Sequence, residues 1–202
     1  MAQGKIVVMY PTWGEARPFM LGPGGGAVEV WRCGIGPAEC AARTAALLVA
    51  RRPDFVLLAG IAGARPRSGL SKGDTVTVSR EYAVDVGTLR GDRFVALPVD
   101  GNDAGNNFYD NPTPLPPLFR SVASDTVAVA GTPLRAGSPA EIENMEGAGF
   151  FAVCGALGVR FAELRCISNY VGEERSGWRV AEAVERLAED VRSFVEAVKT
   201  RF

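Results

Sequence analysis

The chain has 202 residues, of which 47% are hydrophobic and 22% are charged, and its formal net charge is −1. This is the composition of a globular protein large enough to bury a real core, and it excludes the basic surface that nucleic acids or anionic membranes attract. The N-terminal apolar run is too short for a signal peptide, and no later run approaches the length of a membrane span.

The sequence contains no histidine. Ser-His-Asp catalysis, Cys-His catalysis and His-ligated metal sites are therefore excluded, and any acid–base chemistry must rest on carboxylates, amides, Lys, Tyr or Cys. The four cysteines lack CxxC spacing and lie in apolar surroundings: Cys33, Cys40, Cys154 and Cys166. We expect reduced structural thiols in a cytoplasmic protein, with no metal site and no cofactor.

The first part of the chain alternates between strand and helix patterns. A strand over residues 5–10 ends at Pro11, and a glycine-rich turn over residues 22–26 precedes a second strand over 27–33. A helix then opens at Gly34-Ile35-Gly36-Pro37 and ends at Pro53, and a third strand over 55–59 runs into a glycine turn. Continuous apolar strands separated by a helix are typical of a parallel sheet covered by helices.

The second part continues this pattern. Strands are predicted over residues 74–79 and 161–169, and residues 143–157 form an apolar stretch that predicts a buried helix. Residues 101–117 are rich in Asn, Asp, Gly and Pro, so we expect a loop and the most mobile segment. From Trp178 onward, apolar residues at helical spacing predict an amphipathic helix that closes the fold. We expect one α/β domain over residues 1–202, with a mixed twisted central sheet flanked by helices.

Three polar residues fall where α/β sheets form their sites, beyond the carboxyl ends of strands or on a helix facing them. Glu15 follows the first strand, Asn169 ends the strand 161–169, and Glu146 lies near the start of the predicted buried helix. Glu15 could equally be a solvated loop charge, and Asn169 a turn residue. Glu146 could be an acid favoured by the helix dipole, although its apolar neighbours leave it little exposed surface.

Two further features have open interpretations. Arg165 lies inside an apolar strand and should pair with a buried acid, for which Glu146 is one candidate. The turn Gly34-Ile35-Gly36 could hold a phosphate at a helix start, but a tight strand-to-helix turn explains it equally well.

Five segments carry a resemblance to a known superfamily: KIVVMYPTWGE, CGIGPAECA, LLAGIAGA, ENMEGAGFFAVC and LRCISNYVG. Together they resemble the purine nucleoside phosphorylase and nucleosidase superfamily, and within it most of all the futalosine hydrolase family. The resemblance covers nearly the whole chain except residues 101–140, which look short. It implies a nucleoside phosphorylase-like fold, a nucleoside substrate, no cofactor, and a homodimer or higher homo-oligomer.

The resemblance also implies roles for individual residues. Glu146 would accept hydrogen bonds from ribose hydroxyls with Met145 packed on the sugar, Glu15 would position and deprotonate water, and Asn169 would contact the purine. A carboxylate bonded to the ribose would stabilise an oxocarbenium-like transition state. The remaining residues expected to bind substrate are Ile61, Ala62, Gly63 and Ser168.

The same comparison favours hydrolysis over phosphorolysis. Phosphorylases of the superfamily hold phosphate through an Arg and a Ser or Thr, where this chain has Leu58 and Ile61. Glu15 would repel phosphate but suits activation of water, whereas nearby Arg17 leaves the phosphorylase reading open. Asn169 can donate hydrogen bonds to N7 and O6 of a 6-oxopurine, but an amide cannot transfer a proton to N7. Adenosine nucleosidases of the superfamily have an Asp here, which can.

We therefore expect an enzyme that releases hypoxanthine from futalosine, a step of the menaquinone route through futalosine. Three alternatives remain open. They are a 6-oxopurine nucleoside phosphorylase, a methylthioadenosine/S-adenosylhomocysteine nucleosidase, and a nucleoside-binding module without turnover.

Overall fold

The structure is a computed structural model that describes residues 4–99, 106–131 and 138–201. Its strands are β1 Ile6–Tyr10, β2 Glu29–Arg32, β3 Phe55–Ala64, β4 Thr75–Ala83, β5 Gly87–Arg90, β6 Arg93–Ala96, β7 Phe108–Asp110, β8 Arg120–Thr126, β9 Ile142–Asn144 and β10 Arg160–Tyr170. Its α-helices are α1 Trp13–Leu21, α2 Pro37–Arg51, α3 Gly147–Ala156 and α4 Val180–Lys199. Short 3-10 turns lie at Gly25–Ala27, Pro66–Ser68 and Arg175–Gly177.

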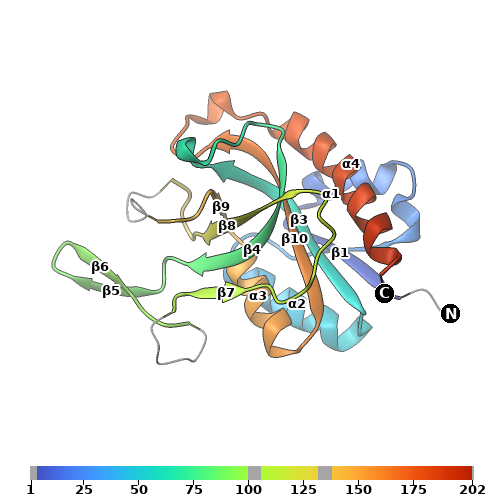
Figure 1. The fold of residues 1–202 in the computed structure, drawn as a ribbon, viewed down its shortest axis with the longest axis horizontal. Coiled ribbons are helices and arrows are strands. Elements are labelled where there is room, and N and C mark those ends of the chain that lie inside the picture. Colours follow the sequence, from blue (N-terminus) through green and yellow to red (C-terminus); the bar gives the residue numbers. More distant parts are fainter. Residues whose placement is uncertain (1–3, 100–105, 132–137, 202) are drawn as a thin grey trace.

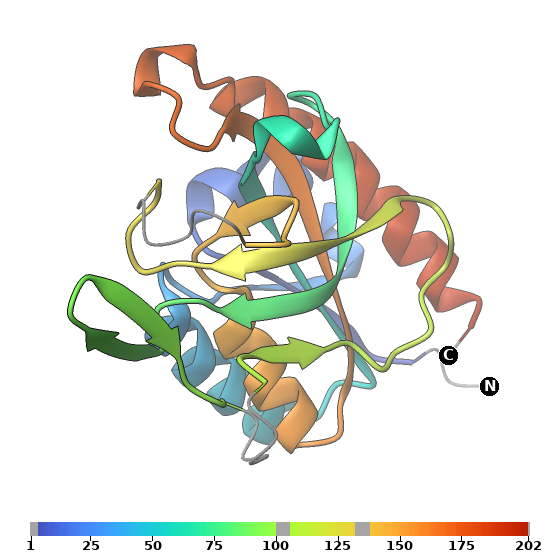
Figure 2. The same ribbon diagram turned by 60° about the vertical axis from the view of Figure 1, so that its left-hand side comes forward.

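The central sheet is mixed, as predicted. β3 pairs in parallel with β1 and with β10, and β10 also pairs antiparallel with β4. β4 continues through β8 and β9 back to β3, so this part of the sheet closes on itself. The hairpin of β5 and β6 forms a separate sheet that extends away from the rest (Figure 2).

Two helix pairs cover the sheet from opposite sides (Figure 1). Alternation along β1 and β3 explains this arrangement, because successive side chains of a strand point to opposite faces. Val7 and Leu58 belong to the core under α2 and α3, whereas Val8 and Leu57 belong to the core under α1 and α4. Strands that are apolar on both faces require helices on both faces.

Helix α1 was not predicted, and the alternative that Glu15 is a solvated loop charge is wrong. Pro18 lies inside this helix and Gly14 near its start, and both residues disfavour helix in a sequence reading. The sequence does contain a start signal, because Thr12 and Glu15 have the spacing of a capping box. Glu15 is therefore a buried residue of the first helical turn.

The loop predicted over residues 101–117 needs correction in part. Residues 101–105 lie outside the described residues, and Phe108–Asp110 form β7, which pairs with β4. Asp110 accepts a bidentate hydrogen bond from Arg80 of β4, at 2.7 and 2.9 Å. The mobility of this segment stays a prediction.

The four cysteines are buried and free, as predicted for structural thiols. Burial raises the pKa of Cys154 and Cys166, which keeps both as unreactive thiols. In the part of the chain that the structure describes, no helix is both long and apolar enough to cross a membrane.

Candidate active site

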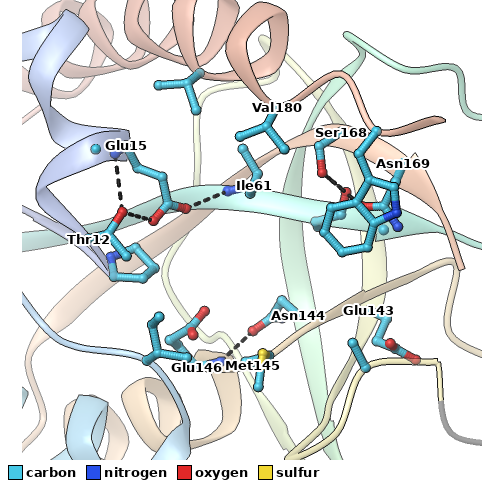
Figure 3. Close-up of a pocket in the computed structure, with 18 of the residues that line it drawn as sticks. Thr12, Glu15, Ile61, Glu143, Asn144, Met145, Glu146, Ser168, Asn169 and Val180 are labelled. Carbon is cyan, nitrogen blue, oxygen red and sulfur yellow. Dashed lines mark hydrogen bonds between the residues drawn. The ribbon is translucent and has the colours of Figure 1, made fainter. Parts of the chain in front are cut away.

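A cavity of about 700 Å³ opens beside the carboxyl ends of β3 and β10. All of the candidate residues from the sequence line it: Glu15, Ile61, Ala62, Gly63, Met145, Glu146, Ser168 and Asn169. Figure 3 shows Glu15 and Glu146 on opposite sides of one end of the cavity, with Asn169 at the other end. We call the end with Glu15 and Glu146 the acidic end; the other end holds the amide of Asn169, with Glu143 on the same side.

Glu15 is held by the cap of its own helix. Thr12 accepts the backbone N–H of Glu15 at 3.2 Å and donates its hydroxyl to Glu15 Oε2 at 2.7 Å, and Ile61 N–H donates to Oε1 at 3.2 Å. Burial raises the pKa of Glu15 and nearby Glu146 adds to this, while the hydrogen bonds and the charge of Arg165 oppose it. A carboxylate with a raised pKa is a stronger base towards water.

Glu146 immediately precedes α3, so the prediction that it lies within a helix spanning residues 143–157 is wrong at the start. Asn144 Oδ1 accepts the N–H groups of Glu146 and Gly147, both at 2.8 Å, and so caps the helix from a strand. Glu146 Oε1 accepts the N–H of Gly36 at 3.2 Å. The glycine turn before α2 thus binds a carboxylate of the protein itself.

Arg165 connects the acidic end of the cavity to the core, and its side chain is fully buried. Its Nη1 donates to Glu146 Oε2 at 3.1 Å and to Ile61 O at 3.3 Å, which confirms the predicted pairing with a buried acid. Its Nε donates to Glu163 Oε1 at 2.7 Å and its Nη2 to Asn144 Oδ1 at 3.0 Å. The guanidinium therefore bridges the cavity floor and a second acid behind it.

Gly60 makes this approach possible. Nη1 of Arg165 and Oε1 of Glu15 both lie over Gly60, where any side chain would overlap the guanidinium. Gly60 thus has a packing role. It lets Glu15 lie close to the guanidinium of Arg165, which also bonds Glu146.

Asn169 is fixed in one orientation by its neighbours. Its Oδ1 accepts the Ser168 hydroxyl at 2.8 Å, and its Nδ2 donates to the Tyr170 carbonyl at 3.0 Å. A flipped amide would place two carbonyl oxygens against each other, so the flip is disfavoured. One amide hydrogen remains for a ligand, fewer than the two donors expected from the sequence.

The rest of the lining is mostly apolar. It includes, from α1, α4 and the neighbouring loops, Pro11, Pro18, Ile35, Trp178, Val180 and Val184. The guanidinium of Arg175 stacks over the Trp178 ring at 4.6 Å from its centroid, at the part of the lining that also contains Asn169 and Ser168. Such a lining suits a ligand with a large apolar portion.

Two residues of the network around the cavity were not predicted from the sequence. Asn144 and Glu163 belong to the same hydrogen-bonded network as Glu146, Asn144 from the short strand β9 and Glu163 from the largely apolar strand β10. The alternation within FAELRC was the available signal, since Glu163 and Arg165 two positions apart on one strand point to the same face.

Comparisons with known proteins identify the family to which the chain is similar. Residues 119–199 match the model of the phosphorylase superfamily. The futalosine hydrolase of Thermus thermophilus is 36% identical over 200 residues, covering 88% of this chain and 87% of that protein. The futalosine hydrolase of Streptomyces coelicolor is 38% identical over 191 residues, covering 81% and 76%.

A solved structure shares the fold at lower identity. The 5'-methylthioadenosine/S-adenosylhomocysteine nucleosidase from Helicobacter pylori superimposes with a TM-score of 0.78, at 19% identity, over 97% of this chain and 99% of that one. The predicted nucleoside phosphorylase-like α/β fold is therefore confirmed.

Proposed function

The chain belongs to the futalosine hydrolase family, and from that premise we propose that it releases hypoxanthine from futalosine in the cavity between Glu15, Glu146 and Asn169. The reaction is hydrolysis of an N-glycosyl bond. The products are hypoxanthine and dehypoxanthine futalosine.

The observation that carries the proposal is the pair of carboxylates around Arg165. Glu15 and Glu146 face the same end of the cavity, and each is held in place by a backbone N–H, from Ile61 and Gly36 respectively (Figure 3). A nucleoside whose sugar lies at this end places its base towards Asn169. The cavity thus supplies negative charge at the sugar and a hydrogen-bond donor at the base.

These positions support a mechanism with balanced charges. Glu146 accepts hydrogen bonds from the ribose hydroxyls and stabilises the cation that develops at the anomeric carbon. Glu15 takes a proton from water as the water oxygen bonds to that carbon. The C–N bond breaks with its electron pair moving onto the base, and the free Nδ2–H of Asn169 stabilises the negative charge that gathers there. The base then takes a proton from solvent to become hypoxanthine, and Glu15 releases to solvent the proton that it took from water.

Water is a better nucleophile here than phosphate. Leu58, at the position where phosphorylases carry an arginine, is fully buried, and Ile61 is apolar. The guanidinium of Arg165 is already bonded to Glu146, Glu163 and Asn144. Arg17 is exposed on α1 and does not belong to the described lining, so it gives the phosphorylase alternative no support.

The apolar lining between α1 and α4 supports a substrate with an aromatic tail rather than a small nucleoside. Pro18 of α1 and Val180 and Val184 of α4 belong to this part of the cavity. We also propose a place in menaquinone biosynthesis, a cytoplasmic location and a homo-oligomeric state.

The experiment is base release from futalosine, inosine and methylthioadenosine, each in phosphate and in a non-phosphate buffer of equal ionic strength. We expect hypoxanthine from futalosine at the same rate in both buffers, and little release from the other two. Ribose-1-phosphate products or strict phosphate dependence would establish a phosphorylase. Preference for methylthioadenosine would favour the adenine nucleosidase alternative, and no release of base would favour a binding module.

A further inference from the structure

Behind the cavity floor lies a group of buried carboxyls that the reaction itself does not use. Glu81 of β4 and Glu163 of β10 are both fully buried, and they lie on the side of Arg165 away from the cavity. We call Glu81 and Glu163 the inner acid pair.

Both oxygens of Glu81 receive hydrogen-bond donors. Asn144 Nδ2 donates to Oε1 at 2.6 Å and the Thr126 hydroxyl donates to Oε2 at 2.6 Å. The Thr126 oxygen accepts the N–H of Ala148 at 2.7 Å, so the hydrogen of the hydroxyl points away from that N–H and bonds Glu81. The orientation of Asn144 is equally fixed, since its Oδ1 accepts the N–H of Glu146 and Gly147. Glu81 is thus tied to the start of α3.

Glu163 is satisfied on one oxygen only. Its Oε1 accepts Arg165 Nε at 2.7 Å, whereas Oε2 is buried and receives no donor from any residue that the structure describes. Glu81 is the group that lies against it, because a side chain placed on Gly147 would meet both Glu81 Oε1 and Glu163 Oε2. Two carboxyl oxygens that face each other in a dry core need a proton between them.

The total charge leads to the same conclusion. Glu15, Glu146 and the inner acid pair would place four negative charges around the single positive charge of Arg165 if all were ionised. Burial of so large an uncompensated charge is too costly for a folded protein. One proton shared within the inner acid pair removes a negative charge at a place where, among the residues that the structure describes, Arg165 is the cation in contact.

We propose that Glu81 and Glu163 share one proton, and that the resulting acid–carboxylate pair is a positioning element that holds Arg165 against Glu146 at the sugar end of the cavity. The inference rests on the proposed function for its effect on catalysis. Burial and mutual repulsion raise the pKa of Glu81, and burial raises the pKa of Glu163, which is consistent with a proton retained at neutral pH. Because the two groups interact strongly, the proton belongs to the pair.

Loss of this proton would change the cavity floor. A second negative charge behind Arg165 would draw the guanidinium inward and weaken its bond to Glu146. The charged and titratable groups that face the inner acid pair are Arg165 on β10 and Glu146 before α3, with Glu15 on α1 and Cys33 after β2 beyond them. Cys33 stays a neutral thiol over the pH range of the test, because a hydrogen bond with Cys40 and burial raise its pKa.

The test is the pH dependence of kcat with futalosine in wild type and Glu163→Gln. Glutamine keeps an oxygen for Arg165 Nε and places a non-titrating N–H towards Glu81. We expect an alkaline loss of kcat in wild type that is absent, or displaced upward by at least about one pH unit, in Glu163→Gln. The same limb in both proteins overturns the proposal. Glu196→Gln, on the exposed face of α4, makes the same substitution elsewhere and should leave the limb in place.

Two further variants separate positioning from catalysis. Glu146→Gln removes the charge at the sugar and should lower kcat by about a hundredfold at every pH. Glu163→Leu offers neither an acceptor to Arg165 nor a donor to Glu81, so its kcat should fall at every pH and should not be restored at low pH. Recovery of Glu163→Leu at low pH would contradict the assignment.

The infrared difference spectrum between wild type and Glu163→Gln tests for the shared proton and requires no turnover. At neutral pH, wild type should show the carbonyl stretch of a buried protonated carboxylic acid, and Glu163→Gln should lack it. A wild-type spectrum without this band, or a band that survives in Glu163→Gln, overturns the proposal. Failure of wild type to cleave futalosine would instead reject the proposed function and leave the infrared result standing.

Discussion

At the residue scale, Asn169 carries the distinction between a 6-oxopurine and a 6-aminopurine in the proposed reaction. Ser168 and Tyr170 commit its oxygen and one of its hydrogens, so a single N–H faces the cavity. A single donor suits N7 or O6 of hypoxanthine. Specificity for the base should therefore respond to the loss of this one hydrogen.

We predict that Asn169→Asp reverses part of this preference. An ionised carboxylate would face two acceptors of hypoxanthine and the Tyr170 carbonyl, so kcat/KM for a 6-oxo substrate should fall on the order of a hundredfold. A 6-amino substrate with the same sugar should lose less, because its amino group donates to a carboxylate. The measurement is the ratio of kcat/KM values in both proteins, and an unchanged ratio removes Asn169 from base recognition.

The three polar residues of the candidate site could be predicted because each has a recognisable place in the sequence pattern. Glu15 follows an apolar strand, Asn169 lies at the carboxyl end of one, and Glu146 interrupts an apolar stretch. Glu81 and Glu163 could not, because what distinguishes them is a contact between strands far apart in the chain. An acidic residue inside an apolar strand indicates that it has a buried partner, but the sequence does not identify that partner.

At the element scale, the start of α3 brings together the cavity and the inner acid pair. The N–H groups of Gly147 and Ala148 are bonded to Asn144 and Thr126, which both also bond Glu81. The positive end of the helix dipole therefore points at the acids. Gly147 is the residue through which the helix and the pair approach each other most closely.

We predict that Gly147→Ala destabilises the protein by about 1–3 kcal/mol, because the new methyl group overlaps the oxygens of Glu81 and Glu163. Gly155→Ala on the same helix is the matched control, since a side chain at Gly155 meets no neighbouring atom within 4 Å. This second change should stabilise by roughly 0.4–1 kcal/mol through the unfolded state. Urea unfolding of both variants provides the comparison, and equal effects would refute the overlap.

Elements with a single clear period were predictable and elements without one were not. The strand predicted over residues 5–10 and the helix predicted from Pro37 agree with β1 and α2 to within one or two residues. The stretch 143–157 is apolar without a polar face at helical spacing, so the sequence alone could not place the boundary between β9 and α3. Capping by Asn144 sets that boundary.

At the scale of the whole molecule, the buried acids tie stability to pH. The folded protein raises the pKa of Glu15, Glu81 and Glu163 above their unfolded values, so it binds more protons than the unfolded chain does. Stability from these groups is fully present below the unfolded pKa. It is lost as pH rises through the folded pKa.

We predict that the free energy of unfolding of wild type falls as pH rises above 4.5, the ordinary pKa of a glutamate side chain, by at most about 1.4 kcal/mol per pH unit for each retained proton. Glu163→Gln should give a flatter dependence, because the amide has no proton to lose and leaves Glu81 as a well-bonded anion. Urea unfolding at a series of pH values measures both slopes. Parallel slopes in the two proteins would show that the inner acid pair does not titrate on unfolding.

The pairing of β3 with β10 has a consequence for how this molecule is made. Ile61 and Arg165, which touch in the cavity floor, are 104 positions apart, and β10 occupies the full length of β3 on one side. During synthesis, β3 emerges long before its partner and must wait with an open edge. Contacts of such long range form slowly. A nascent chain that ends before β10 can therefore hold neither the arginine nor the carboxylates in place, and activity should appear only after β10 and α4 have left the ribosome.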